Sequence, residues 1–348
     1  MHLKLGLANV SIPLNAFSVD IGPCDIYASG STPCVAAHST TRALYGAYFG
    51  PLYQVWRKTD GVTLNIKPVT AGGVADSAAQ DAFCQGPDPN CFITIIYDQS
   101  GHSNHLTQAL PGTFVGPEAN GYDSIANAKS APVYLQNNYK AYGVYIGAGS
   151  GYRNDKPTDT AVGDQPQGIY AVFDATHYND KCCFDYGNGE ISRTNTGNGH
   201  MEAVYFGSSK YYGGDPDAAD GPRILADLEN GLFASYGTEA NGNWPTIPSS
   251  WQFVTATLKG TANQYCIKGG DATAGTLNTY FNGQRPNLPG YNPMSKEGAI
   301  VLGIGGDNSD WAEGTFYEGV ITAGYPSDDI EDLVQANIVA AKYSTSIS

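Results

Sequence analysis

Short apolar or alternating segments recur along the chain, and clusters of Gly, Pro, Asn and Asp separate them. Their lengths and their content of Val, Ile, Phe and Tyr are typical of β-strands. The clearest segments are residues 92–97, 168–174, 201–207, 223–229, 251–260, 299–305 and 315–324. Because they do not alternate with long helices, a parallel sheet covered by helices is not expected. The pattern predicts an all-β protein built as an antiparallel β-sandwich.

Helical patterns are few. The best one follows Ser327, a good N-cap, and places acidic residues in the positive first turn of a C-terminal helix. Its apolar stripe at helical spacing consists of Ile330, Leu333, Val334, Ile338 and Ala341. We also expect short helices at residues 39–48, capped by Ser39, and at residues 73–84.

No internal repeat or low-complexity linker divides the chain, so we expect residues 22–348 to form a single domain. Residues 1–21 are expected to be a separate N-terminal segment. This segment would be a leader remnant, but it makes a poor signal peptide because Asn9, Ser11 and Pro13 interrupt its apolar part.

The charge balance restricts the partners. The chain has 18 Lys and Arg against 33 Asp and Glu, which gives a formal net charge of −15. This balance argues against nucleic acid and against anionic membranes, both of which need a basic face. The chain also lacks an apolar stretch long enough to span a membrane. With 24 Tyr among its residues, it suits a neutral polysaccharide, although an acidic surface can also simply keep a secreted protein soluble.

Seven cysteines occur, and six of them form three close pairs in the sequence. Local disulfide bridges and an extracellular location are expected, since no C-x2-C zinc spacing is present. Cys266 is the odd one, and we expect a buried thiol there. Cys182 and Cys183 are adjacent. Their Cα atoms should lie closer together than in an ordinary disulfide, so geometry alone favours two separate thiols.

Two carboxylates end the segment at residues 223–229. On a strand, Asp227 and Glu229 would point to the same face, away from Ile224 and Ala226, and Asn230-Gly231 would end the strand. A third carboxylate, Asp307, follows an apolar segment and Gly305-Gly306. Each could be an ordinary solvated or turn residue. Together they meet the requirement for glycoside hydrolysis, which uses two carboxyl groups facing one sugar.

Other chemistry has little support. His102 and His105 have i, i+3 spacing, but no helix pattern or acidic cluster around them indicates a metal site. No G-x-S-x-G nucleophile motif and no phosphate-binding loop occurs. We therefore expect no metal and no cofactor.

Several long motifs together resemble a known family. They include "TIIYDQSG" (94–101), "THYNDKCCFDYGN" (176–188), "GHMEAVYFG" (199–207), "DGPRILADLENGLF" (220–233) and "AIVLGIGGDNSD" (299–310). In this order they are similar to the catalytic domain of fungal-type α-L-arabinofuranosidase B enzymes, glycoside hydrolase family 54. The resemblance runs from about Gly22 to Tyr343.

The resemblance implies a concanavalin-like or lectin-like β-sandwich. It also implies a secreted, monomeric, retaining exo-enzyme that releases terminal α-L-arabinofuranosyl groups from arabinan and arabinoxylan. Glu229 would be the nucleophile and Asp307 the general acid/base. Asp227, Asn230 and the backbone of Gly306 would contact the sugar.

The same resemblance implies three disulfides. Cys182 and Cys183 would form a vicinal disulfide that lines the sugar pocket. The resemblance therefore favours a disulfide where geometry alone favours two separate thiols. The other pairs would be Cys24–Cys34 and Cys84–Cys91.

Two departures from the family pattern stand out. Tyr212 occupies a pocket position that is Trp in family members, so sugar selection is open to change. Family members also continue into an arabinose-binding β-trefoil, which we do not expect within these residues. Two alternatives therefore stay open: a lectin-like module that only binds sugar, and a glycosidase acting on β-xylosides or galactofuranosides.

Overall fold

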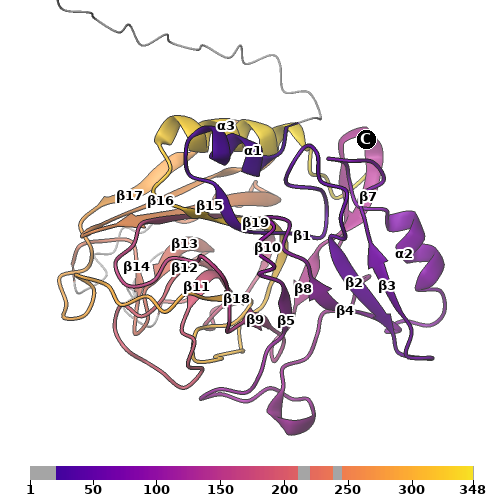
Figure 1. Cartoon of the computed structure of the whole chain (residues 1–348), viewed down its shortest axis with the longest axis horizontal. Helices are drawn as coiled ribbons and strands as arrows, with labels where there is room; N and C mark the ends of the chain where they lie inside the picture. Colours follow the sequence, from indigo (N-terminus) through magenta and orange to yellow (C-terminus); the bar gives the residue numbers. More distant parts are fainter. Residues whose placement is uncertain (1–20, 211–219, 238–244, 348) are drawn as a thin grey trace, which may run out of the picture.

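The computed structural model describes residues 21–210, 220–237 and 245–347, and within them two antiparallel sheets stack face to face (Figure 1). The seven-stranded sheet has the order β1 (Cys34–Ser39), β19 (Gly314–Ala323), β10 (Gln167–Tyr178), β15 (Phe253–Thr261), β16 (Gln264–Asp271) and β17 (Asn278–Gly283), with β8 (Val144–Ile146) also paired to β19. The predicted antiparallel β-sandwich is confirmed.

The ten-stranded sheet carries the candidate site. Its order is β14 (Leu232–Phe233), β13 (Arg223–Asp227), β12 (Glu202–Gly207), β11 (Asp185–Gly189), β18 (Ala299–Leu302), β9 (Tyr152–Asn154), β5 (Leu106–Gln108), β4 (Cys91–Ile96), β2 (Tyr53–Arg57) and β3 (Thr63–Ile66). A separate hairpin joins β6 (Pro132–Leu135) and β7 (Tyr139–Tyr142).

Aromatic side chains fill the space between the sheets. The ring of Phe173 on β10 stacks on Phe206 of β12, with 5.6 Å between ring centroids. Tyr186 of β11 lies 5.0 Å from Phe316 of β19. These rings are fully buried, and such burial is the main favourable contribution to folding.

The helices are α1 (Pro23–Ser29), α2 (Ser77–Phe83) and α3 (Asp328–Ala340), with 3-10 turns at Ala119–Gly121 and Gln136–Asn138. The first and last helices lie together on the outer face of the seven-stranded sheet (Figure 1). As predicted, Ser327 caps α3, where its Oγ accepts a hydrogen bond from the Ile330 amide at 3.3 Å. In the part of the chain that is described, no helix combines the length and the apolar character needed to cross a membrane.

The predicted helix at residues 39–48 is wrong. Ser39 ends β1, and its Oγ accepts hydrogen bonds from the amides of Thr41 and Arg42, which shapes a turn instead. Arg42 then reaches the buried Glu318 on β19, with its Nε 2.5 Å from Oε2. This ion pair between distant parts of the chain outweighs the local helical pattern. The helix predicted at 73–84 is present but shorter, because Asp76 caps it one residue before Ser77.

Three disulfides are formed: Cys24–Cys34, Cys84–Cys91 and Cys182–Cys183. The first joins α1 to β1, and the second joins the end of α2 to β4. Cys266 on β16 is a buried free thiol, and burial raises its pKa to about 11. It is therefore not an activated nucleophile.

Helix α3 is attached to the sheet by a buried ion cluster. Lys259 of β15 and Lys268 of β16 place their Nζ atoms 2.7 and 2.8 Å from Oε2 of Glu331, which is 3% exposed. Glu331→Gln leaves both buried ammonium groups without their buried carboxylate partner. We expect the free energy of unfolding to fall by about 3 kcal/mol, as when one member of a buried pair is removed.

Denaturant unfolding of Glu331→Gln measures this loss. The matched control is Asp329→Asn, an exposed residue in the same helical turn, which should change stability little. Equal effects of the two substitutions would contradict the assigned role of the buried cluster.

Candidate active site

One pocket on the ten-stranded sheet collects almost all the residues singled out in the sequence. The segments after β13 and β18 and the segment before β11 line it. The pocket contains about 550 Å³ of space, including the solvent at its mouth. Its lining includes Cys182, Cys183, Asp227, Glu229, Asn230, Gly306 and Asp307. Tyr212 lies outside the described residues.

A strained turn presents Glu229. The strand predicted to run to residue 229 ends at Asp227, so strand alternation does not position Glu229. Instead Glu229 and Asn230 both adopt left-handed backbone conformations, with φ of 64° and 51°. Such conformations cost free energy for residues other than glycine and persist where surrounding contacts hold them.

Those contacts are present. The Asp227 Oδ1 accepts a hydrogen bond from the Glu229 amide at 3.0 Å, and the Tyr291 hydroxyl donates to the Glu229 carbonyl at 2.6 Å. The Asn230 side chain donates to Oδ1 of Asn198 at 2.8 Å and to the Thr196 carbonyl. The backbone is fixed on both sides of the Glu229 carboxyl group.

Asp307 lies in a second pinned loop, after β18. Its Oδ1 accepts a hydrogen bond from the Ser309 amide at 3.0 Å, and its carbonyl accepts one from the Thr113 amide at 3.0 Å. A Cβ at Gly112 would collide with the carbonyls of Arg193 and Asp307, so only glycine permits this close approach. The loop at 112–114 therefore holds Asp307 from outside.

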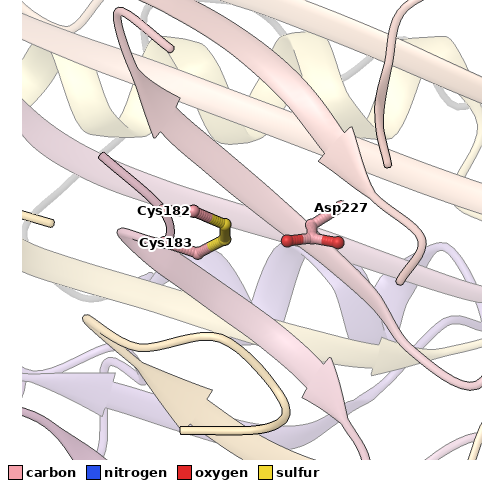
Figure 2. A group of neighbouring side chains, drawn as sticks. All are labelled: Cys182, Cys183 and Asp227. Atoms are coloured by element: carbon pink, nitrogen blue, oxygen red, sulfur yellow. A yellow bond between two sulfur atoms is a disulfide. The ribbon is translucent and has the colours of Figure 1, made fainter. Parts of the chain in front are cut away.

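The vicinal disulfide forms one wall of the pocket. Figure 2 shows the sulfur atoms of Cys182 and Cys183 facing the carboxyl group of Asp227. These ligand atoms lie within 4.8 Å of one another. Because the sulfurs are bonded to each other, neither is a thiolate, and the group offers a metal a single carboxylate. A sulfur wall beside a carboxylate instead suits a small polar ligand with an apolar face.

Two further carboxyl groups, which were not expected from the sequence, lie buried behind the residues that line this pocket. Asp185 begins β11 and Glu190 follows its end, and both are 0% exposed. The Asp185 carboxyl contacts that of Asp227, and the Glu190 carboxyl contacts that of Glu229. Among the described residues, no side chain or amide other than Asp227 donates a hydrogen bond to the Asp185 oxygens.

Burial and like charge raise the pKa values of this cluster of carboxyl groups. Burial, followed by the contact with Glu190 and the charges of Glu190, Asp227 and Asp307, raises the pKa of Glu229 far above its usual range. Burial is the largest cause that raises the pKa of Asp227 to about 7, and burial also raises the pKa of Asp185 and Glu190. Two contacting carboxyl groups in a low-dielectric site cannot both ionise easily, so each member of a pair raises the pKa of the pair as a whole.

A buried arginine stabilises the backbone around the cluster. Arg153 of β9 donates from Nη1 to the Gly306 carbonyl at 3.1 Å and from Nη2 to the Glu190 carbonyl at 2.8 Å. Its Nε pairs with Asp155. Gly306 in turn lies against the Glu190 side chain, where a Cβ on residue 306 would overlap Oε2 of Glu190.

The two histidines considered for a metal site have separate partners. Nδ1 of His102 lies 3.0 Å from Oδ2 of Asp159, and Nδ1 of His105 accepts a hydrogen bond from the Asp98 amide. They do not converge on one position.

Comparison with known proteins places this chain in a family. The family model for the catalytic domain of alpha-L-arabinofuranosidase B matches residues 23–344. The chain belongs to the α-L-arabinofuranosidase B catalytic family. It is 64% identical over 326 residues to a probable alpha-L-arabinofuranosidase B of Aspergillus terreus, covering 94% of this chain and 63% of that protein. It is 61% identical over 335 residues to alpha-L-arabinofuranosidase B of Aspergillus oryzae, covering 96% and 65%.

Solved structures of arabinofuranosidases are also similar to this chain. A glycoside hydrolase family 54 α-L-arabinofuranosidase carrying a Glu→Gln mutation and soaked with 4-nitrophenyl α-L-arabinofuranoside has a TM-score of 0.90 and 59% identity, covering 94% of this chain and 66% of that one. An arabinofuranosidase complexed with arabinofuranosyl-α-1,2-xylobiose has a TM-score of 0.89 at the same identity, covering 93% and 66%. The chain spans just under two thirds of the length of these α-L-arabinofuranosidase B relatives.

An aromatic rim of this family pocket was also missed from the sequence. Phe114 and Trp311 line the mouth, with their rings edge to face at 4.4 Å between centroids. The two residues are far apart in the sequence and come together only because the loop at 112–114 binds the Asp307 backbone. The Trp next to the "GDNSD" motif is the one local signal that could have indicated it.

The raised pKa of Asp227 predicts a gain in stability when it is neutralised. Asp227 ionises near its ordinary pKa in the unfolded chain but at about 7 in the folded one. The folded state is therefore favoured while Asp227 keeps its proton, and this advantage is lost as pH rises from about 4 to about 7. Asp227→Asn should increase the free energy of unfolding relative to wild type by up to about 4 kcal/mol at pH 7, and much less at pH 4.

Urea unfolding at both pH values checks this difference. Asp60→Asn is the control, because the pKa of Asp60 is shifted in the opposite direction to that of Asp227. The hydrogen bond from Arg57 lowers the pKa of Asp60. That variant should gain no stability at pH 7. A stability change in Asp227→Asn that is the same at both pH values would contradict the assignment.

Proposed function

We propose that the protein is a secreted, retaining, exo-acting α-L-arabinofuranosidase. The observation that carries this proposal is that Glu229 and Asp307, from two separate pinned loops, line one pocket whose wall is the Cys182–Cys183 disulfide. Membership of the family supports the same substrate class. We also propose that residues 22–348 act as one catalytic domain and as a monomer.

The reaction proceeds by double displacement. The Glu229 carboxylate attacks the anomeric carbon while Asp307 gives its proton to the glycosidic oxygen, so the C–O bond breaks and the leaving group departs as an alcohol. Asp307, now ionised, removes a proton from water. The water oxygen attacks the same carbon, arabinose is released and Glu229 is freed as a carboxylate. Two inversions give net retention.

The surrounding groups position the sugar. Asp227 and Asn230 lie beside Glu229 and offer a carboxyl oxygen and an amide oxygen to ring hydroxyls, while the Gly306 backbone and the disulfide cover apolar parts of the ring. Since Asp227 and Cys183 are 5% and 2% exposed, this part of the pocket is deep and suits one terminal sugar. Such a shape favours removal of end groups from arabinan and arabinoxylan. The three disulfides support an extracellular location.

Replacing the proposed nucleophile should abolish turnover. Glu229→Gln keeps the shape of the side chain but cannot form the covalent intermediate, so kcat on 4-nitrophenyl α-L-arabinofuranoside should fall by at least about 10³-fold. The thermal midpoint should not fall, because the substitution removes a buried carboxyl group.

Glu118→Gln, an exposed residue that does not line the pocket, is the matched control and should keep full activity. Normal turnover by Glu229→Gln would rule out the assignment of the nucleophile. Wild-type protein that binds arabinan without releasing arabinose would instead favour the lectin-like alternative.

The contact between Glu190 and Glu229 predicts a change in pH dependence. Glu229 must be ionised to attack, and Glu190 raises its pKa both by contact and by charge. Glu190→Gln removes that cause, so the pKa of Glu229 falls. The acid limb of the kcat/KM profile should move to lower pH by at least about one unit. A profile that stays in place or moves to higher pH would contradict the role given to Glu190.

A further inference from the structure

We propose that Trp311 and Phe114 form the binding site for the sugar that leaves, and that its ligand is a neutral pyranose ring such as a xylose unit of a polysaccharide backbone. This inference rests on the proposed function and names the part of the substrate that lies outside the deep pocket. It concerns residues that the proposed mechanism does not use.

Trp311 is unusually exposed for its type. It is 44% exposed, while the other described tryptophans, Trp56 and Trp251, are only partly exposed. Its ring lies at the pocket mouth beside Phe114, and both residues line the pocket. A large aromatic surface left open next to a concave site indicates a place where a ligand covers it.

Hydrogen bonds to the neighbouring backbone hold the Trp311 and Phe114 rings, which together we call the platform, in place. The Asn179 side chain donates a hydrogen bond to the Trp311 carbonyl at 3.0 Å, and the Gly149 amide donates to the Asp310 carbonyl at 2.6 Å. Phe114 is fixed through the bond between the Thr113 amide and the Asp307 carbonyl. A preorganised ring loses little entropy when it binds a sugar.

The position of Asp307 indicates that the sugar that leaves contacts the Trp311 and Phe114 rings. A general acid must lie beside the glycosidic oxygen, so the leaving sugar extends on the side of Asp307. Trp311 follows Asp307 by four residues in the same loop. The deep groups, Asp227 and Cys183, are buried, whereas the Trp311 ring is open to solvent. The departing arabinose therefore occupies the deep part, and the next sugar meets the aromatic rim.

The chemistry of the rim selects the type of sugar. A pyranose with equatorial hydroxyls has a flat C–H face that matches an indole ring, whereas a furanose ring is puckered and covers less of it. Each described residue that lines the pocket is neutral or acidic. Uronic acids are disfavoured here, because the lining offers them carboxyl groups and no cation.

Two substrates with the same arabinose and different leaving groups test the proposal. Methyl α-L-arabinofuranoside has no leaving sugar, and arabinofuranosyl-xylobiose carries two xylose rings. In Trp311→Ala, kcat/KM should fall on arabinofuranosyl-xylobiose by about tenfold more than on the methyl glycoside, and a tenfold change corresponds to about 1.4 kcal/mol of lost binding. Trp311→Phe keeps an aromatic face and should restore most of the difference.

Phe49→Ala is the matched control, because Phe49 is 53% exposed and does not line the pocket. It should leave both substrates unchanged. An equal fall on both substrates in Trp311→Ala would overturn the proposal, since Trp311 would then act on the deep site itself. Absence of turnover by wild-type protein on both substrates would instead refute the proposed function.

A direct binding measurement covers the case in which Trp311→Ala folds poorly. Xylobiose alone should inhibit hydrolysis of the methyl glycoside competitively, and its inhibition constant should rise in Trp311→Leu, which keeps an apolar side chain but removes the aromatic face. Xylobiose that does not inhibit the wild-type enzyme, or inhibits both proteins equally, would overturn the proposal. Inhibition by glucuronic acid that is as strong as by xylobiose would overturn the selection for neutral sugars.

Discussion

Repulsion between buried carboxyl groups is the constraint on which this pocket depends. Asp185 contacts Asp227 and Glu190 contacts Glu229, and all four side chains are largely removed from water. Such groups gain little from one another and lose hydration, so they separate or stay protonated unless the fold holds them together. The stacked sheets hold them. Burial of the aromatic core stabilises the fold enough to offset the unfavourable free energy of these carboxyl pairs. Functional sites commonly reduce stability in this way.

The backbone of the turn at Glu229 also lowers the stability of the fold. Glu229 and Asn230 take left-handed conformations that neither side chain prefers. Hydrogen bonds from Tyr291 and to Asp227 compensate. Arg153 connects the two halves, since one guanidinium binds the carbonyls of both Gly306 and Glu190. The segment before Asp307 and the segment after β11 are thus held by one guanidinium group, and Glu190 in turn contacts Glu229. Acid–base and covalent catalysis require preorganisation of this kind.

Features that depend on residues close together in the sequence could be predicted, and features that depend on contacts between distant residues could not. The strands and the C-terminal helix depend on local periodicity and on a local cap, so they were predicted well. Asp227, Glu229 and Asp307, which the sequence singled out, line one pocket, but strand alternation does not place Glu229, because it lies in a turn after the strand ends. The helix expected at 39–48 failed because Arg42 pairs with Glu318, a contact across most of the chain. Asp185, Glu190, Phe114 and Trp311 gave little or no local signal, because their role arises from neighbours that only the fold supplies.

Gly306 has a consequence for how this site can change. A methyl group there would overlap the Glu190 carboxyl, which contacts Glu229. The loop that carries Asp307 and the turn that carries Glu229 therefore meet in one small volume at Glu190. A change in either loop would therefore have to keep both the glycine at position 306 and the Glu190 carboxyl group in place. A side chain at position 306 would have to displace the Glu190 carboxyl group, and with it the contact that Glu190 makes with Glu229.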